Sequence, residues 1–164
     1  EGHLRPSSDL ETHLAIYRAF PTVRGVVHTH SRFATVWAQA KKEIPVFGTT
    51  HADYFYGPVP VTGEMQPDEI EEAYERNTGE VIVRRFSGLD PQHMPAVLVA
   101  GHGPFCWGGS AADAAHNSML LEEVARMAYF TVTLNSQAEP ISQALLDKHF
   151  LRKHGPGAYY GQNR

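Results

Sequence analysis

Apolar and polar positions along this chain separate buried strands from amphipathic helices. Residues 25–29 and 96–100 are short apolar runs with Gly or polar residues beside them, a pattern typical of buried strands. Apolar positions three to four residues apart predict helices over the following ranges: 10–19, 32–40, 111–134 and 142–153. Strands separated by helices of this length indicate an α/β layered domain.

Shorter patterns complete the expected fold. Residues 44–47 and 81–83 are brief apolar runs that we interpret as two further strands. Pro67 suits the first turn of an acidic helix over 68–76, and 49–57 form a polar, aromatic loop. We find no repeat and no long linker, so we expect one domain over 1–164.

The helices also carry expectations about their ends and faces. Ser8 and Glu11 have the spacing of a capping box, with Ser8 at the N-cap of the first helix. In the 111–134 helix, Met119 and Met127 share an apolar stripe that we expect to face inward. The neighbouring Glu122 and Glu123 are interpreted as a solvated face.

Composition narrows the class of protein and its surroundings. A formal net charge of −4 and a pI near 6.2 give no electrostatic reason to expect nucleic acid or an anionic membrane as a partner. No apolar stretch approaches the roughly 20 residues that span a bilayer. Cys106 is the single cysteine, so a reducing cytoplasm is expected, and its apolar neighbours favour a small buried hydrophobe over a nucleophile.

The strongest chemical signal is His28-Thr29-His30 directly after the first strand. Side chains two residues apart on a strand project from the same side, and two imidazoles there are half of a divalent transition-metal site. The alternative is a pair of polar residues where a strand emerges into solvent. His102, between Gly101 and Gly103 at the end of the second long strand, favours a three-histidine zinc site with an open fourth position.

Residues at the start of the first helix offer weaker candidates. Asp9 is either a metal ligand or a favourable anion in the first turn of the helix, and the residues alone favour the second reading. Ser7 and Ser8 precede the helix, so their hydroxyls and the free N–H groups form either an anion site or an ordinary N-cap.

Two further residues are candidates for acid–base work. Asp53 lies among aromatic side chains, which can raise the pKa of a carboxyl group toward that of a general base; loop acids are also common on surfaces. Tyr160, in a Gly-bounded tail, is either an acid activated by a nearby cation or an aromatic anchor.

Four motifs together resemble the class II aldolase/epimerase family. In chain order they are Pro6-Ser7-Ser8-Asp9, Val27-His28-Thr29-His30-Ser31, Gly48-Thr49-Thr50-His51-Ala52-Asp53-Tyr54 and Gly101-His102-Gly103-Pro104-Phe105. The resemblance extends from Pro6 to Gln162. The Ala52-Asp53-Tyr54 loop and the Tyr159-Tyr160-Gly161-Gln162 end favour the L-ribulose-5-phosphate 4-epimerases over the aldolases of that family.

This resemblance implies a set of roles. Zinc would be bound by His28, His30 and His102, with Asp9 as a further ligand, although other divalent transition metals suit the same donors. Ser7 and Ser8 would help to hold the substrate phosphate, and Asp53 and Tyr160 would be the acid–base pair. The implied assembly is a homotetramer with active sites between subunits, and the implied fold is a central, mainly antiparallel sheet with helices on both faces.

The implied reaction interconverts L-ribulose 5-phosphate and D-xylulose 5-phosphate by cleaving and re-forming the C3–C4 bond. The alternatives are a class II sugar-phosphate aldolase that releases its products and an inactive metal-binding fragment. The family's N-terminal segment carries a Gly-Asn phosphate loop, and we expect this chain to lack that part. Ala100-Gly101 stand where the epimerases usually carry a His-Ser pair, a difference that bears on substrate choice.

Overall fold

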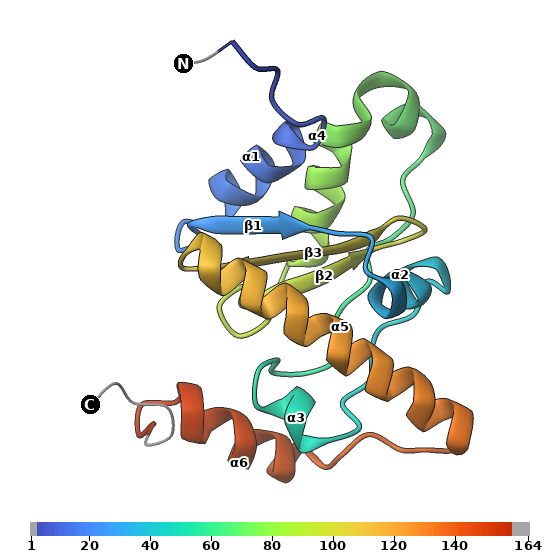
Figure 1. Ribbon diagram of the computed structural model, residues 1–164, viewed down its shortest axis with the longest axis vertical. Helices are drawn as coiled ribbons and strands as arrows, with labels where there is room; N and C mark the ends of the chain where they lie inside the picture. The colour runs from blue at the N-terminus through green and yellow to red at the C-terminus, as the bar shows by residue number, and fades with distance from the viewer. Residues whose placement is uncertain (1–2, 159–164) are drawn as a thin grey trace.

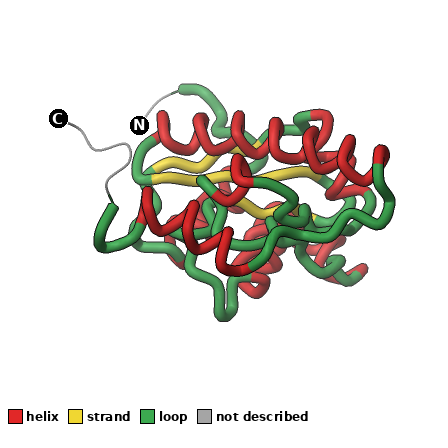
Figure 2. Tube along the Cα trace, turned by 90° about the horizontal axis from the view of Figure 1, so that it is seen from below, coloured by secondary structure: helices red, strands yellow, loops and turns green. Residues whose placement is uncertain are grey.

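A three-stranded antiparallel sheet lies at the centre of the computed structural model, which describes residues 3–158. The strands are β1 (Gly25–His28), β2 (Ala96–Val99) and β3 (Gly103–Gly108), in the spatial order β1-β3-β2. Both pairings are antiparallel, and the central β3 is buried along nearly all of its length. Figures 1 and 2 show this sheet as a layer between helices, so the expected α/β fold with helices on both faces is confirmed.

Helices cover the two faces of the sheet unequally. They are α1 (Leu10–Ala19), α2 (Arg32–Gln39), α3 (Thr49–Ala52), α4 (Pro67–Arg85), α5 (Ala111–Leu134) and α6 (Gln143–His154). In Figure 1, α1 and α4 lie above the sheet, and the long α5 crosses below it. The one-turn helix α3 packs against α6, and both lie beyond α5.

Aromatic residues tie the helical layer to the sheet. Phe20 and Phe86, at the ends of α1 and α4, lie with their ring centroids 5.3 Å and 4.9 Å from Trp107 of β3. On the opposite side, the indole N–H of Trp37 in α2 donates to the carbonyl of Ala125 in α5, at 3.0 Å. The core is therefore continuous from one helical layer through the sheet to the other.

The strand predicted over 81–83 is wrong, because these residues belong to α4. The buried positions in this stretch include Thr78, Val81 and Ile82, which are spaced as one face of a helix. A three-residue apolar run cannot distinguish a strand from a buried helical face. The helix also continues well past the predicted end at residue 76. Within the predicted range it is kinked at Ala73, where the backbone has φ −158° and ψ 64°.

The sequence did not reveal the central strand β3. Pro104 lies in it, and proline is unusual in a central strand because it has no N–H to donate. Conversely, the predicted strand 44–47 is reduced to an isolated bridge between Ile44 and Val59. The first four residues of the predicted loop 49–57 form α3.

Three expectations about helix ends and faces are also corrected. α1 has Asp9, not Ser8, at its N-cap, and no side chain caps it, so the predicted capping box is absent. Met119 and Met127 of α5 are 58% and 44% exposed, because the sheet covers a narrower stripe of this helix than the sequence suggested. Glu122 is partly buried rather than solvated. Within 3–158, no helix combines the length and apolar character needed to cross a bilayer.

Candidate metal centre and acid–base cluster

Strand register brings the histidines together. In the β1–β3 pairing His28 lies opposite Phe105, close to the beginning of β3. His102 lies in the turn between β2 and β3, three residues before Phe105. The end of β1 and this turn therefore meet at the same edge of the sheet, although the histidines are 74 residues apart in sequence.

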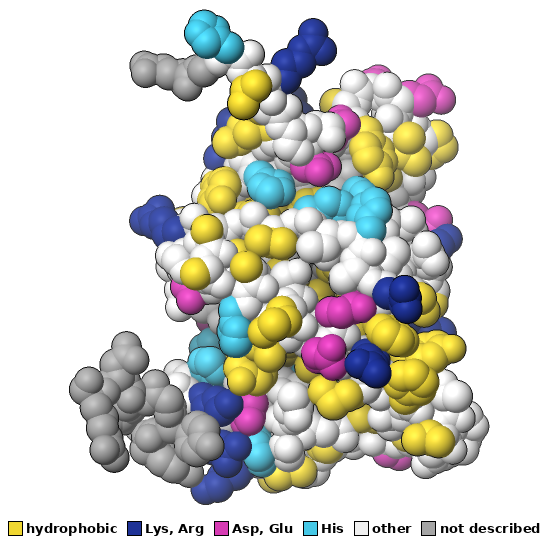
Figure 3. All heavy atoms as spheres, in the orientation of Figure 1, with side chains coloured by type: hydrophobic (Ala, Val, Ile, Leu, Met, Phe, Trp, Pro, Cys, Tyr) yellow, Lys and Arg dark blue, Asp and Glu magenta, His cyan; other side chains and the backbone are white. Residues whose placement is uncertain are grey.

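The three imidazoles form a compact cluster. His28 Nε2 and His30 Nε2 are 3.1 Å apart, and one ligand atom from each of His28, His30 and His102 lies within 4.8 Å of the others. A tetrahedral zinc ion with bonds of about 2.0–2.1 Å separates its ligand nitrogens by about 3.3 Å. The spacing of the His28–His30 pair therefore fits a shared divalent metal, and histidine side chains gather on the face shown in Figure 3.

Contacts behind the rings direct their free nitrogens toward the centre of the cluster. His28 Nδ1 donates to the carbonyl of Pro104 at 2.9 Å, and its ring stacks on Phe105 with centroids 4.1 Å apart. Tyr74 Oη lies 3.4 Å from His102 Nδ1. Because a carbonyl can only accept, the Pro104 contact fixes the tautomer and orientation of His28 and leaves its Nε2 as the ligand atom, whereas Tyr74 helps to orient the ring of His102.

Burial also prepares two of the rings to bind metal. Desolvation lowers the pKa of both His28 and His102, and the nearby negative charge of Asp9 offsets part of this effect. A lowered pKa keeps an imidazole neutral at physiological pH, the form that binds a metal ion.

An open pocket of about 430 Å³ surrounds the cluster. Its lining is formed by Ser8, Asp9, His28, Thr29, His30, Tyr74, Glu75 and His102. Asp9 and Ser8 therefore reach the same space as the histidines, whereas Ser7 is exposed beside it and accepts a hydrogen bond from the Asp9 N–H at 3.3 Å. Among residues 3–158, the cluster of metal-ligand atoms contains the imidazoles and not the Asp9 carboxylate.

Tyr74 and Glu75 also line the pocket, although no pattern in the sequence indicated them. They follow directly after the kink of α4 at Ala73, and Thr12 of α1 donates to the Glu75 carbonyl at 2.5 Å. The sequence offers no signal for this kink, because no proline or glycine marks it. The break directs this part of α4 toward the histidines.

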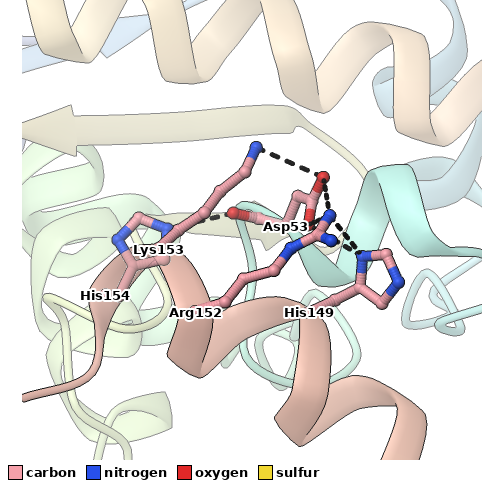
Figure 4. Close-up of polar contacts among 5 residues, drawn as sticks. All are labelled: Asp53, His149, Arg152, Lys153 and His154. Atoms are coloured by element: carbon pink, nitrogen blue, oxygen red, sulfur yellow. Dashed lines mark hydrogen bonds and ion pairs between the residues drawn. The ribbon is translucent and has the colours of Figure 1, made fainter. Parts of the chain in front are cut away.

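Asp53 lies in a second cluster, formed with basic side chains of α6. As Figure 4 shows, its carboxylate contacts His149 at 3.0 Å, Arg152 at 3.1 Å and Lys153 at 3.2 Å. His154 Nε2 donates to the Asp53 carbonyl at 3.0 Å. This arrangement connects α3 to α6.

The expected raised pKa of Asp53 is wrong. Desolvation raises it, but hydrogen bonds from His149, Lys153 and Arg152 together outweigh that effect, and the net pKa lies below the usual value of an aspartate. Asp53 is therefore an ionised carboxylate at neutral pH. The aromatic neighbours in sequence gave the wrong direction because the nearest atoms in space are cationic or donors.

The two clusters occupy different parts of the molecule. Asp53 does not line the pocket of the histidines. Figure 3 shows histidines in the upper part of the face and others among the basic side chains at the lower left. Tyr160, the second expected acid–base residue, lies outside the described residues.

A family model for the class II aldolase and adducin N-terminal domain matches residues 1–129. The chain belongs to the class II aldolase and adducin family. Within this family it is homologous to the L-ribulose-5-phosphate 4-epimerases UlaF of Salmonella paratyphi B and Salmonella typhi. It is 53% identical to each over 162 residues, which cover 99% of this chain and 71% of each relative.

Solved structures of the family share the fold. An L-fuculose 1-phosphate aldolase superposes with a TM-score of 0.72 at 19% identity, over 91% of this chain and 64% of that protein. YgbL of Klebsiella pneumoniae, described as a putative aldolase/epimerase/decarboxylase, gives a TM-score of 0.67 at 27% identity, over 90% and 67%. At 19% identity the aldolase supports the architecture and not its own reaction for this chain.

Proposed function

We propose that this protein is a metal-dependent epimerase that interconverts L-ribulose 5-phosphate and D-xylulose 5-phosphate by breaking and re-forming the C3–C4 bond. The observation that carries the proposal is the cluster of His28, His30 and His102 in a chain 53% identical to L-ribulose-5-phosphate 4-epimerases. C4 of these sugars is not acidic, so direct deprotonation is a poor route to inversion. Cleavage beside a carbonyl avoids that difficulty.

Zinc is the metal that we propose for the histidine cluster, with Asp9 as an additional ligand. Three neutral nitrogen donors that leave an open position are typical of catalytic zinc. When bound, the metal supplies a Lewis acid that stabilises negative charge developing on the substrate oxygens. The position of Asp9 in the same pocket supports its role, because a carboxylate there also compensates the charge of a divalent cation.

Ser7 and Ser8 are proposed to hold part of the substrate phosphate. They lie immediately before α1, where backbone N–H groups and the positive end of the helix favour an anion. Both hydroxyl-bearing residues are exposed, and Ser8 lines the pocket of the histidines. A phosphate bound here would hold the two-carbon fragment while it turns to present its other face.

Asp53 and Tyr160 are proposed as the two proton-transfer groups. Inversion at C4 directs the C4 oxygen to opposite sides in substrate and product, so two groups are needed. The lowered pKa of Asp53 leaves its carboxylate ionised and able to accept a proton at neutral pH, because hydrogen bonds from α6 outweigh desolvation; the same shift makes it a weaker base than a free aspartate. A tyrosine is neutral at that pH and can supply a proton.

We further propose a homotetramer in which each site joins the metal pocket of one subunit to the Asp53 cluster of another. The separation of the two clusters within one chain supports this arrangement. So do the exposed large apolar side chains on the outer face of α5, which are Met119, Met127, Tyr129, Phe130 and Leu134.

Incubation with zinc and L-ribulose 5-phosphate tests the proposed reaction, with D-xylulose 5-phosphate measured as product. We expect His28→Asn to lose both bound metal and turnover, and Tyr160→Phe to keep metal and lose rate. His116→Asn, an exposed histidine on α5, is the matched control. Metal binding without turnover in the wild-type chain would overturn the proposed activity. Release of free glycolaldehyde phosphate in stoichiometric amounts would favour an aldolase.

A further inference from the structure

A carboxylate from the middle of α5 caps the helix that follows the metal-site histidines. Glu122 Oε1 accepts a hydrogen bond from the N–H of Phe33 at 2.9 Å, and Oε2 accepts one from the N–H of Ala34 at 3.0 Å. These are N–H groups of the first turn of α2, which begins at Arg32. The cap and the helix it serves are 88–89 residues apart in sequence.

The helix has no cap of its own. Ser31 stands at its N-cap position with an extended backbone, but its side chain makes no capping hydrogen bond. The Ser31 hydroxyl is buried and has no hydrogen-bond partner among the described residues. Glu122 therefore accepts the hydrogen bonds that an N-cap side chain would normally accept. Its negative charge also lies at the positive end of the helix dipole.

The capped turn is directly joined to the histidine cluster. His30 lies two residues before the start of α2. The Ser31 carbonyl accepts the first helical hydrogen bond, from the Thr35 N–H at 2.9 Å, but the Ser31 N–H reaches only Thr29 Oγ1, at a long 3.4 Å. The Thr29 N–H is similarly distant, 3.4 Å from the Pro104 carbonyl. The Glu122 bonds, at 2.9–3.1 Å, are shorter than both contacts of Thr29 and join the start of α2 to α5.

α5 is well placed to serve as the anchor. It packs along both β1 and β3, the strands whose ends bring His28 and His102 together. A link from α5 to the start of α2 therefore fixes His30 relative to the other two histidines. Rotation or displacement of α2 would otherwise carry His30 with it.

We propose that Glu122 is a positioning residue for the metal centre, holding His30 in register with His28 and His102 through the N-terminus of α2. This inference rests on the proposed metal site. It predicts that the geometry of the bound metal depends on a carboxylate that does not line the metal pocket.

The test measures metal binding, not turnover. Zinc dissociation constants, from competition with a chelator, and the visible absorption of the Co²⁺-loaded protein are compared among Glu122→Ala, Glu122→Gln and the wild-type chain. Glu123→Ala is the matched control, because this neighbour is 58% exposed in its side chain and lies 3.9 Å from Arg126. Glutamine has the same length and keeps one acceptor oxygen, so Glu122→Gln can retain one of the two backbone contacts but loses the other and the negative charge.

We expect zinc to bind about ten-fold more weakly to Glu122→Ala, in the range found for residues that orient metal ligands, with Glu122→Gln intermediate. The Co²⁺ spectrum should change in the same order, whereas Glu123→Ala should match the wild type. Unchanged affinity and spectrum in both Glu122 variants, even with a lower melting temperature, would overturn the inference. A wild-type chain that binds neither metal would instead overturn the proposed metal centre itself.

Discussion

His149 Nδ1 lies 3.0 Å from Asp53 Oδ1, although 96 residues separate them in sequence. The same nitrogen lies 2.9 Å from Arg152 Nη2. With a proton on Nδ1 the imidazole donates to Asp53, and in the other tautomer it accepts from Arg152. In both states the carboxylate keeps its contacts to Arg152 and Lys153, so α6 determines the charge state of a residue at the end of α3.

Asp53→Asn should lower the free energy of unfolding at pH 7 by about 1–2 kcal/mol, because it removes the anion that three basic side chains share. The pKa of Asp53 is lower in the folded protein than in the unfolded chain. This stabilisation is therefore fully present above the pKa of the unfolded chain, and it is lost as pH falls through the pKa of the folded protein. Urea unfolding at pH 7 and pH 3 measures it. The difference from wild type should shrink at pH 3, and Asp68→Asn, on an exposed part of α4, is the control.

His51 should make the protein sensitive to acid. Its side chain is 4% exposed, and desolvation lowers its pKa to about 4, against an opposing hydrogen bond to the Gly57 carbonyl at 2.8 Å. His51 therefore binds a proton at higher pH in the unfolded chain than in the folded protein. Its contribution to the free energy of unfolding is fully present above about pH 6.5 and falls by up to about 3 kcal/mol as pH falls toward 4.

His51→Gln should remove this part of the pH dependence while costing some stability at pH 7. Urea unfolding at several pH values between 7 and 5 measures the slope of the free energy of unfolding against pH. The control is His3→Gln, which changes an exposed histidine. Equal slopes in His51→Gln and the wild type would rule out His51 as the source of acid sensitivity.

Gly103→Ala should weaken metal binding without unfolding the sheet. A Cβ at this position would lie 2.9 Å from the Thr29 carbonyl oxygen and 3.3 Å from the His30 ring, with His28 at 3.6 Å. The Thr29 backbone and the His30 ring must move by a few tenths of an ångström, whereas the distance to His28 is an ordinary contact, and we expect about a ten-fold loss of zinc affinity. Gly63→Ala has nothing within 4 Å of the new Cβ and should bind zinc as the wild type does.

Gly79→Ala should destabilise the contact between α1 and α4. The added Cβ would lie 2.5 Å from Ala15 Cβ, closer than two carbons can pack. Overpacking of this kind costs about 1–3 kcal/mol, more than the gain in helix propensity from replacing glycine. Thermal unfolding measures the loss. The double variant with Ala15→Gly removes the colliding atom, so it should recover most of the stability if the clash is the cause.

Local patterns determined much of the fold and the metal centre. The run before His28 and the His28-Thr29-His30 spacing predicted a strand with two imidazoles on one side, and these imidazoles do face each other. Gly101, which precedes His102, has φ +72°, in the left-handed region that glycine adopts readily. Such features follow from a few consecutive residues, so the sequence alone contains them.

Tertiary packing decided the rest. The apolar run at Val81 and Ile82 fits either a strand or a helix, and it lies in α4, which packs against α1. β3 is central because it pairs with a strand on each side. The pKa of Asp53 and the cap formed by Glu122 depend on side chains 88 or more residues away. Charge and hydrogen bonding act over a few ångströms in space, and a linear sequence does not state which distant residues will be that close.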